Sequence, residues 1–226
     1  MENEMEITST KKTTINKMNV LITGPSGVGK TFLASTLPPK DTIILSVESG
    51  LLTLAEFDID VAELKSADKV VELRSVLGEL AKSDYKNIYI DSLTEISDLF
   101  YEYAKKEFPE DSHTMKRYGR TKELIKNFLK YCRDMNKNTY FTALDHTDKD
   151  DTGRRFSVPL LVGSMKYECT AMFDFVFRLD VFAKDDKEVR ALLTKKKAGI
   201  EAKSRSQKLE EYEPADLTAI MMKVMG

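Results

Sequence analysis

The chain has 226 residues, which is long enough for one sizeable α/β domain but short for two independent hydrophobic cores. Its formal net charge of −2 gives no overall attraction for nucleic acid, so a DNA-binding function must depend on a local basic patch. No stretch approaches the roughly 18 consecutive apolar residues of a membrane span. Cys132 and Cys169 lack the spacing of a zinc site or a disulfide framework, which favours a reducing cytoplasm.

The first seventeen residues are polar and contain no apolar segment of the kind that a secretory signal requires. We predict that residues 1–17 form a flexible leader and that residues 18–226 form a single domain. The expected location is the cytoplasm, and no contact with a membrane is expected.

Strand-like and helix-like apolar periodicities alternate along the chain, which is typical of a layered α/β sheet with parallel strands. Strands are predicted at residues 18–23, 42–49, 61–64, 87–91 and 139–144. Helices are predicted at residues 30–37, from a cap at Ser66 to about residue 83, after Asp91 to Pro109, and at 113–137. Residues 145–161 are rich in charged and turn-forming residues and predict a mobile loop. The runs at 173–183 and 188–197 predict an antiparallel hairpin that extends the sheet.

Residues 24–31 read GPSGVGKT, a full match to the phosphate-loop pattern GxxxxGK[ST] between a predicted strand and a predicted helix. Backbone N–H groups of such a loop point at phosphates, and the following helix N-terminus adds its dipole. We expect Lys30 to reach the β and γ phosphates and the Thr31 hydroxyl to ligate Mg²⁺. The residues predicted to bind ATP are Gly24, Pro25, Ser26, Gly27, Val28, Gly29, Lys30 and Thr31.

An acidic residue at the end of a neighbouring strand should complete the Mg²⁺ site. Asp91 follows the apolar run 88–90 and is the candidate for this Walker B carboxylate. The alternative is that Asp91 only caps the helix that begins there.

Hydrolysis also needs a group that polarises the attacking water. In many P-loop ATPases this group is a glutamate directly after the Walker B aspartate, but Ser92 occupies that position here. Glu48 ends the predicted strand 42–49, where ligand-facing residues of such sheets are found, and it is the candidate. The alternative is that Glu48 is a solvated residue at a strand end.

This order of motifs resembles the RecA-like ATPase core. It is most similar to the small phage-encoded nucleotide-binding proteins, AAA family ATPases that are linked to single-strand annealing and recombination. The resemblance covers roughly residues 18–205, and only the phosphate loop is specific by itself. It implies an α/β P-loop NTPase fold with a mainly parallel central sheet, flanking helices and a C-terminal antiparallel hairpin.

The resemblance also implies roles for individual residues. Glu48 would be the catalytic glutamate, and the strand at 139–144 would end in a sensor of the γ-phosphate, either Asp145 or His146. Lys203 and Arg205 would reach the ATP of a neighbouring subunit in a homo-oligomer. The alternative for this basic segment is a solvated strand end. The bacterial recombinase has a glutamine as its sensor, so the coupling of hydrolysis to DNA stays open.

Single-stranded DNA is the partner that the resemblance implies, together with a single-strand-binding protein, in the host cytoplasm if the protein is phage-encoded. Three segments are candidates for the DNA contact. Residues 147–163 carry Arg154 and Arg155, although four aspartates between positions 145 and 151 oppose them. Residues 116–120 place Tyr118 among basic side chains, where it could stack on bases or simply pack on its own helix. Residues 195–205 are the third segment.

Two functions remain open, and two others are disfavoured. The first is a Mg²⁺-dependent, DNA-stimulated ATPase that acts on single-stranded DNA in recombination, annealing or repair. The second is an ATP-switched binding module or loader with slow turnover. A nucleoside monophosphate kinase is disfavoured, because Arg74 is the only arginine between residues 35 and 83. A helicase loader of the AAA+ class is disfavoured as well, because no helical lid is predicted after the sheet.

Overall fold

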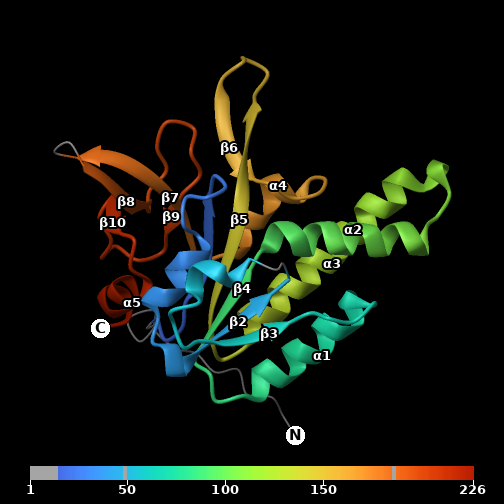
Figure 1. Cartoon of the computed structure of the whole chain (residues 1–226). Coiled ribbons are helices and arrows are strands. Elements are labelled where there is room, and N and C mark those ends of the chain that lie inside the picture. The colour runs from blue at the N-terminus through green and yellow to red at the C-terminus, as the bar shows by residue number, and fades with distance from the viewer. Residues whose placement is uncertain (1–14, 48–49, 185–186) are drawn as a thin grey trace, which may run out of the picture.

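The structure is a computed structural model that describes residues 15–47, 50–184 and 187–226. Within these residues, ten strands form one sheet, and helices cover both of its faces (Figure 1). The strands are β1 (Asn19–Gly24), β2 (Thr42–Ser46), β3 (Asp60–Glu63), β4 (Asn87–Asp91), β5 (Asn138–Lys149), β6 (Arg155–Pro159), β7 (Phe175–Lys184), β8 (Lys187–Leu193), β9 (Lys203–Ser204) and β10 (Tyr212–Pro214).

The order of the strands along the sheet is β10-β8-β7-β1-β5-β4-β2-β3, and β6 and β9 pair with β5 and β7 outside this path. From β7 to β3 all neighbours are parallel, whereas β8, β9, β10 and β6 pair antiparallel. Gly24 is level with Leu144, and Asp91 is level with Ser46. The carboxyl ends of β1, β5, β4 and β2 therefore meet at one edge of the sheet.

Each face of the sheet has its own hydrophobic core. On one face, α1 (Lys69–Lys82), α2 (Leu93–Glu107) and α3 (Thr114–Asp134) bury residues such as Leu73, Phe100 and Phe128 against the strands. On the other face, the 3-10 helix η2 (Thr31–Thr36) and α5 (Leu217–Met225) bury Leu33 and Ile220. The short helix α4 (Met165–Glu168) packs beside β6. This layering is the RecA-like α/β P-loop fold that the sequence predicted, including the antiparallel strands near the C-terminus.

The prediction of a mobile loop at 145–161 is wrong. β5 continues through Lys149 and pairs with β6 along its outer half, from Asp145 opposite Pro159 to Lys149 opposite Arg155. At the turn, Asp150 Oδ1 accepts hydrogen bonds from the backbone N–H groups of Thr152 and Arg154, both at 2.9 Å. A solvated two-stranded ribbon needs no continuous apolar run, so composition alone could not distinguish this hairpin from a loop.

Other boundaries differ in small ways. The helix after the phosphate loop is a 3-10 helix of six residues. Asp68, rather than Ser66, caps α1, because its carboxylate accepts a hydrogen bond from the backbone N–H of Val71 at 3.2 Å. Most of the predicted leader, residues 1–14, lies outside the described residues, whereas Lys17 donates hydrogen bonds to two carbonyls at the end of α3. That residues 18–226 form a single domain stays a prediction. Among the described helices, none has both the length and the apolar character needed to cross a bilayer.

Candidate nucleotide site

The phosphate loop, residues 24–31, connects β1 to η2 in a conformation that requires glycine. A Cβ atom on Gly24 would lie 2.6 Å from the carbonyl oxygen of Leu179, and Gly29 has a φ of +103°. Because η2 is only six residues long, its dipole is smaller than that of a full α-helix. Binding of a phosphate chain here would therefore depend mainly on the N–H groups of the loop itself.

The Lys30 side chain lies over this loop. It is 9% exposed, and its Nζ donates hydrogen bonds to the carbonyl oxygens of Gly24 at 2.9 Å and Pro25 at 2.7 Å. These carbonyls hold the ammonium group at the mouth of the loop. Phosphate oxygens are charged acceptors and form stronger hydrogen bonds with an ammonium group than carbonyls do.

Thr31 and Asp91, the two predicted Mg²⁺ ligands, are in direct contact. The Thr31 hydroxyl donates to Asp91 Oδ2 at 2.7 Å, and the Thr142 hydroxyl donates to Oδ1 of the same carboxylate. A carboxylate with neighbouring hydroxyls is the hard oxygen donor set that Mg²⁺ prefers. The described residues contain no group of three or more His, Cys, Asp or Glu side chains that could hold a metal.

The capping function at the start of α2 belongs to Ser92. Its hydroxyl accepts a hydrogen bond from the backbone N–H of Glu95 at 3.3 Å. The Asp91 carboxylate faces Thr31 and Thr142 instead. The alternative that Asp91 is only a helix cap therefore does not match the geometry.

Two residues of the site were missed by the sequence analysis. Thr142 lies inside β5, and Tyr89 lies inside β4, where its fully buried hydroxyl donates to the carbonyl oxygen of Lys30 at 2.5 Å. Burial raises the pKa of Tyr89 well above its usual range, and the negative charge of Asp91 raises it further. Tyr89 therefore stays a neutral donor at physiological pH.

A cleft of about 250 Å³ opens above these groups. Its lining residues are Ser26, Gly27, Gly29, Lys30, Thr31, Phe32, Gly50, Thr53, Asp91, Ser92 and Leu144. Residues 48 and 49 lie outside the described residues, so the role of Glu48 as the water-polarising group stays a prediction. Gly50, directly after this segment, lines the cleft.

Neither candidate for the γ-phosphate sensor lines the cleft. Asp145 forms an ion pair with Arg178 and accepts a hydrogen bond from Ser157 Oγ at 3.0 Å. These contacts hold its carboxylate on the base of the β5–β6 hairpin. His146 is exposed, two positions beyond the cleft residue Leu144 on the same strand. Its sensing role stays a prediction.

Lys203 and Arg205 lie near the opposite edge of the sheet. Lys203 is partly buried on β9, and burial lowers its pKa. Arg205 Nη1 is 2.7 Å from Asp174 Oδ1, and the N–H of Asp174 donates to the carbonyl of Asn19. Asn19 is about 17 Å from Gly24 along β1, at roughly 3.3 Å per residue. The two basic residues therefore do not reach the phosphate loop of their own chain.

The basic side chains of residues 116–120 are largely occupied by contacts within the helical layer. Arg117 donates to the carbonyls of residues 108–110, and Arg120 pairs with Glu107 at 2.7 Å. The Tyr118 ring stacks on Tyr101, with 5.3 Å between the ring centroids. This arrangement matches the alternative in which Tyr118 packs within the protein.

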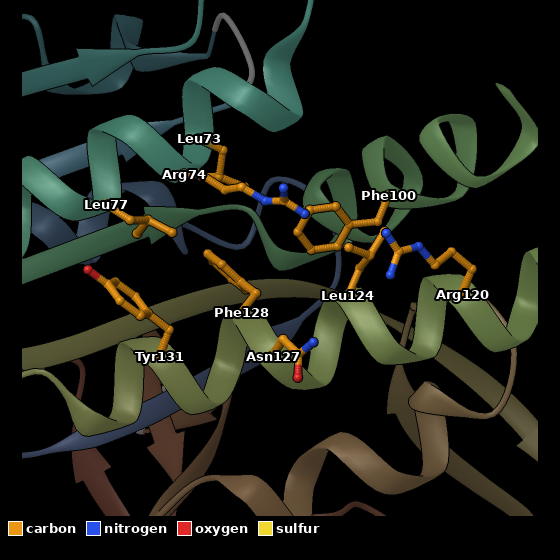
Figure 2. Close-up of a pocket in the computed structure, with 9 residues that line it drawn as sticks. All are labelled: Leu73, Arg74, Leu77, Phe100, Arg120, Leu124, Asn127, Phe128 and Tyr131. Atoms are coloured by element: carbon orange, nitrogen blue, oxygen red, sulfur yellow. The ribbon is translucent and has the colours of Figure 1, made fainter. Parts of the chain in front are cut away.

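A second cavity, of about 270 Å³, lies between α1, α2 and α3 (Figure 2). These helices cover the face of the sheet opposite η2. Its walls include Leu77, Phe100 and Phe128, and Arg74 and Arg120 extend across it. Its lining shares no residue with the cleft at the phosphate loop.

One of the similar solved structures is a KaiC-like protein from the hyperthermophilic archaeon Pyrococcus horikoshii OT3, at 17% identity and a TM-score of 0.49, covering 84% of this chain and 82% of that one. No curated protein matches the sequence. Residues 16–206 match the family described as an AAA domain (AAA_24). The chain therefore belongs to this AAA domain family and is a P-loop ATPase that binds ATP with Mg²⁺.

Proposed function

We propose that the protein is a Mg²⁺-dependent ATPase that acts on single-stranded DNA as a homo-oligomer, in recombination, annealing or repair. The observation that carries the ATPase part is the convergence of Lys30, Thr31 and Asp91 at one cleft. Thr31 begins η2 after the phosphate loop and Asp91 ends β4, so the two contacting residues are separated by 60 positions in the sequence.

The residues of the site would divide the work as follows. The N–H groups of the loop and the Lys30 ammonium group bind the phosphates, and Thr31 and Asp91 would hold Mg²⁺. When bound, Mg²⁺ neutralises charge on the β and γ oxygens. We assign the polarisation of the attacking water to Glu48, and the stabilisation of charge in a neighbouring subunit's site to Lys203 and Arg205.

The DNA part is supported by the way two of the three candidate segments come together. The Ser157 N–H on β6 donates to the Gly199 carbonyl at 2.9 Å, so residues 195–200 lie against the base of the β5–β6 hairpin. This hairpin projects beyond the sheet (Figure 1). The exposed basic residues on the two segments include Lys149, Arg154, Arg155 and Lys195.

The aspartates that seemed to oppose DNA binding are partly neutralised in the structure. Asp148 accepts hydrogen bonds from Lys166 Nζ at 2.8 Å and the Tyr167 hydroxyl at 2.6 Å, and its pKa is lowered, first of all by the bond from Lys166. Asp150 binds the backbone of the hairpin turn. We call the surface formed by residues 147–163 and 195–200 the hairpin face. The neutralised aspartates favour the hairpin face over residues 116–120 as the proposed contact with DNA phosphates.

The test is ATP hydrolysis by the purified protein, with and without single-stranded DNA, with Lys30→Ala as the blank. We expect single-stranded DNA to stimulate hydrolysis. The proposed DNA contact lies on the outer half of β5, and the inner half of the same strand carries Thr142, which contacts Asp91. A hydrolysis rate that does not change with DNA, combined with phosphate transfer to a nucleoside monophosphate, would contradict the proposal and indicate a kinase.

A second function, an ATP-switched binding module or loader with slow turnover, is favoured by one observation. Ser92, which follows Asp91 at the position where many P-loop ATPases have a glutamate, is used as a helix cap. Tight ATP binding with turnover that stays slow on DNA would select this function. A single-strand-binding protein is a proposed partner in either case, and the cytoplasm is the proposed location.

A further inference from the structure

Arg190, on β8, reaches the phosphate loop from a distant part of the sequence. Its Nε donates a hydrogen bond to the carbonyl oxygen of Val28 at 3.1 Å, across 162 positions. The same side chain packs against Gly29, where a Cβ atom would lie 3.4 Å from Arg190 Nε. No sequence motif pointed to this contact, which depends on β8 pairing with β7 beside β1.

The hydrogen bond fixes the direction of one amide group. Among the described residues, the only cis peptide bond is at 91–92, so the Val28–Gly29 peptide is planar and trans. In a trans peptide the C=O and N–H groups point in opposite directions. Because the Val28 carbonyl faces Arg190, the N–H of Gly29 points away from Arg190. Gly29 is also one of the residues that line the cleft.

A second peptide of the loop is held in the same way. The Tyr89 hydroxyl donates to the carbonyl of Lys30, and this directs the N–H of Thr31 to the opposite side. Thr31 lines the cleft as well. Two donors from outside the loop, Arg190 on β8 and Tyr89 on β4, therefore each fix the orientation of one of its peptide groups.

We infer that Arg190 is a positioning residue that aims the Gly29 N–H group at the phosphates of a bound nucleotide. The inference rests on the nucleotide site of the proposed function and is independent of its DNA part. Loop amides contact the α and β phosphates, which ADP and ATP share. Loss of the Arg190 contact should therefore weaken the binding of ADP and of ATP by a similar factor.

Two substitutions separate this role from a direct contact between the guanidinium charge and phosphate. Arg190→Gln keeps a nitrogen donor at the position of Nε and removes the charge. Arg190→Met gives a side chain of about the same length as Gln but removes both the nitrogen donor and the charge. The dissociation constants of ADP and ATP are measured by calorimetry for each variant, with Lys30→Ala as a check that binding occurs at the phosphate loop. Arg133→Met, which changes an exposed arginine paired with Asp134, is the matched control.

The expected result is a loss of affinity of about tenfold for both nucleotides in Arg190→Met, equivalent to about 1.4 kcal/mol, and a loss within about threefold in Arg190→Gln. Thermal unfolding without nucleotide should differ little between these variants and the control. If Arg190→Gln binds the nucleotides as weakly as Arg190→Met does, the positioning role is overturned in favour of a direct contact between the charge and phosphate. Unchanged ADP affinity in the Met variant would overturn it too. Wild-type protein that binds neither nucleotide would instead contradict the nucleotide site itself.

Discussion

The two oxygens of the Asp91 carboxylate contact the hydroxyls of Thr31, at the start of η2, and Thr142, on β5. A carboxylate held from both sides cannot rotate freely, so its orientation toward a metal ion is set before the ion arrives. The Asp91 side chain therefore loses little conformational entropy when a metal ion binds.

Asp91→Asn tests the metal role of this carboxylate. We expect nucleotide binding to survive and Mg²⁺-dependent hydrolysis to fall by about 100-fold or more, because one charged ligand is lost. Steady-state hydrolysis and nucleotide affinity are the measurements. Ser92→Ala is the matched neighbour: it should cost about 1 kcal/mol of stability in urea unfolding through loss of the helix cap and keep most of the activity. The reverse pattern would assign the structural role to Asp91.

Glu48→Gln tests the group that polarises the attacking water. The variant keeps the size of the side chain and removes the base, so we expect ATP to bind with near-normal affinity while turnover is lost. Single-turnover hydrolysis separates the two quantities. Turnover that survives in this variant would place the catalytic base elsewhere in the site.

At the scale of elements, α3 and α4 are joined by one carboxylate. Glu168 on α4 pairs with Lys122 at 2.5 Å and Lys126 at 2.9 Å, and these hydrogen bonds lower its pKa to about 2 from a usual value of 4.5. The contact fixes α4, at the base of the β5–β6 hairpin, to the long helix α3.

This contact predicts a dependence of stability on pH. Because the pKa of Glu168 is depressed in the folded state, its contribution is fully present above pH 4.5 and is lost as the pH falls toward about 2. We expect wild type to be more stable than Glu168→Gln at pH 7, with the difference shrinking through this window. Urea unfolding at a series of pH values measures it. A difference that stays constant down to pH 2 would contradict the ion-pair mechanism.

Sequence reasoning predicted long periodic elements better than exposed or short ones. The strand at 87–91 and the helix at Thr114–Asp134 were predicted within a few residues, because the strand is a short buried apolar run and the helix has a buried apolar face with a clear period. The hairpin of β5 and β6 has no such face over its outer half, so its residues read as a loop. The 3-10 form of η2 could not be predicted from periodicity, because it is set by backbone hydrogen bonds between residues three apart, such as that from the Leu37 N–H to the Ala34 carbonyl at 3.2 Å.

The site was predictable where its chemistry is local in sequence. Lys30 and Thr31 belong to one motif, and Asp91 ends an apolar strand. Thr142 and Arg190 were not predictable, because their contacts exist only once β5 lies between β1 and β4 and β8 lies beyond β7. Strand order is a property of the whole fold, and a single sequence does not specify it residue by residue.

At the scale of the whole molecule, the sheet separates the groups that the proposed mechanism needs. The phosphate loop lies at the carboxyl edge, whereas Arg205 is held by Asp174 near the amino end of β7. Only a second subunit could bring Arg205 to a nucleotide, so a role for it in hydrolysis requires assembly.

Mixed oligomers test this requirement. Arg205→Ala subunits added to wild type should depress its ATPase activity below the additive value, because each variant subunit would impair a neighbour's site. Activity is measured over a range of mixing ratios at constant total protein. Strictly additive activity would show that Arg205 serves only the ion pair with Asp174.

The hairpin face makes its own prediction for DNA. Arg154→Ala combined with Arg155→Ala should weaken binding to a labelled single-stranded oligonucleotide and reduce the slope of log affinity against log salt by about 1.4, since each phosphate contact contributes roughly 0.7. Fluorescence anisotropy at several salt concentrations measures both quantities. Lys116→Ala, in the segment whose arginines are occupied within the helical layer, is the control. An unchanged slope in the double variant would remove the hairpin from the DNA contact.

β5 has a mechanical consequence. The strand runs without interruption from Thr142, which touches the Walker B carboxylate, to Lys149 near the hairpin turn, a length of about 23 Å at 3.3 Å per residue. It is clamped by β1 and β4 at its inner end and paired only with β6 at its outer end. A displacement of the hairpin tip would therefore be transmitted along β5 to Thr142 and to its contact with Asp91.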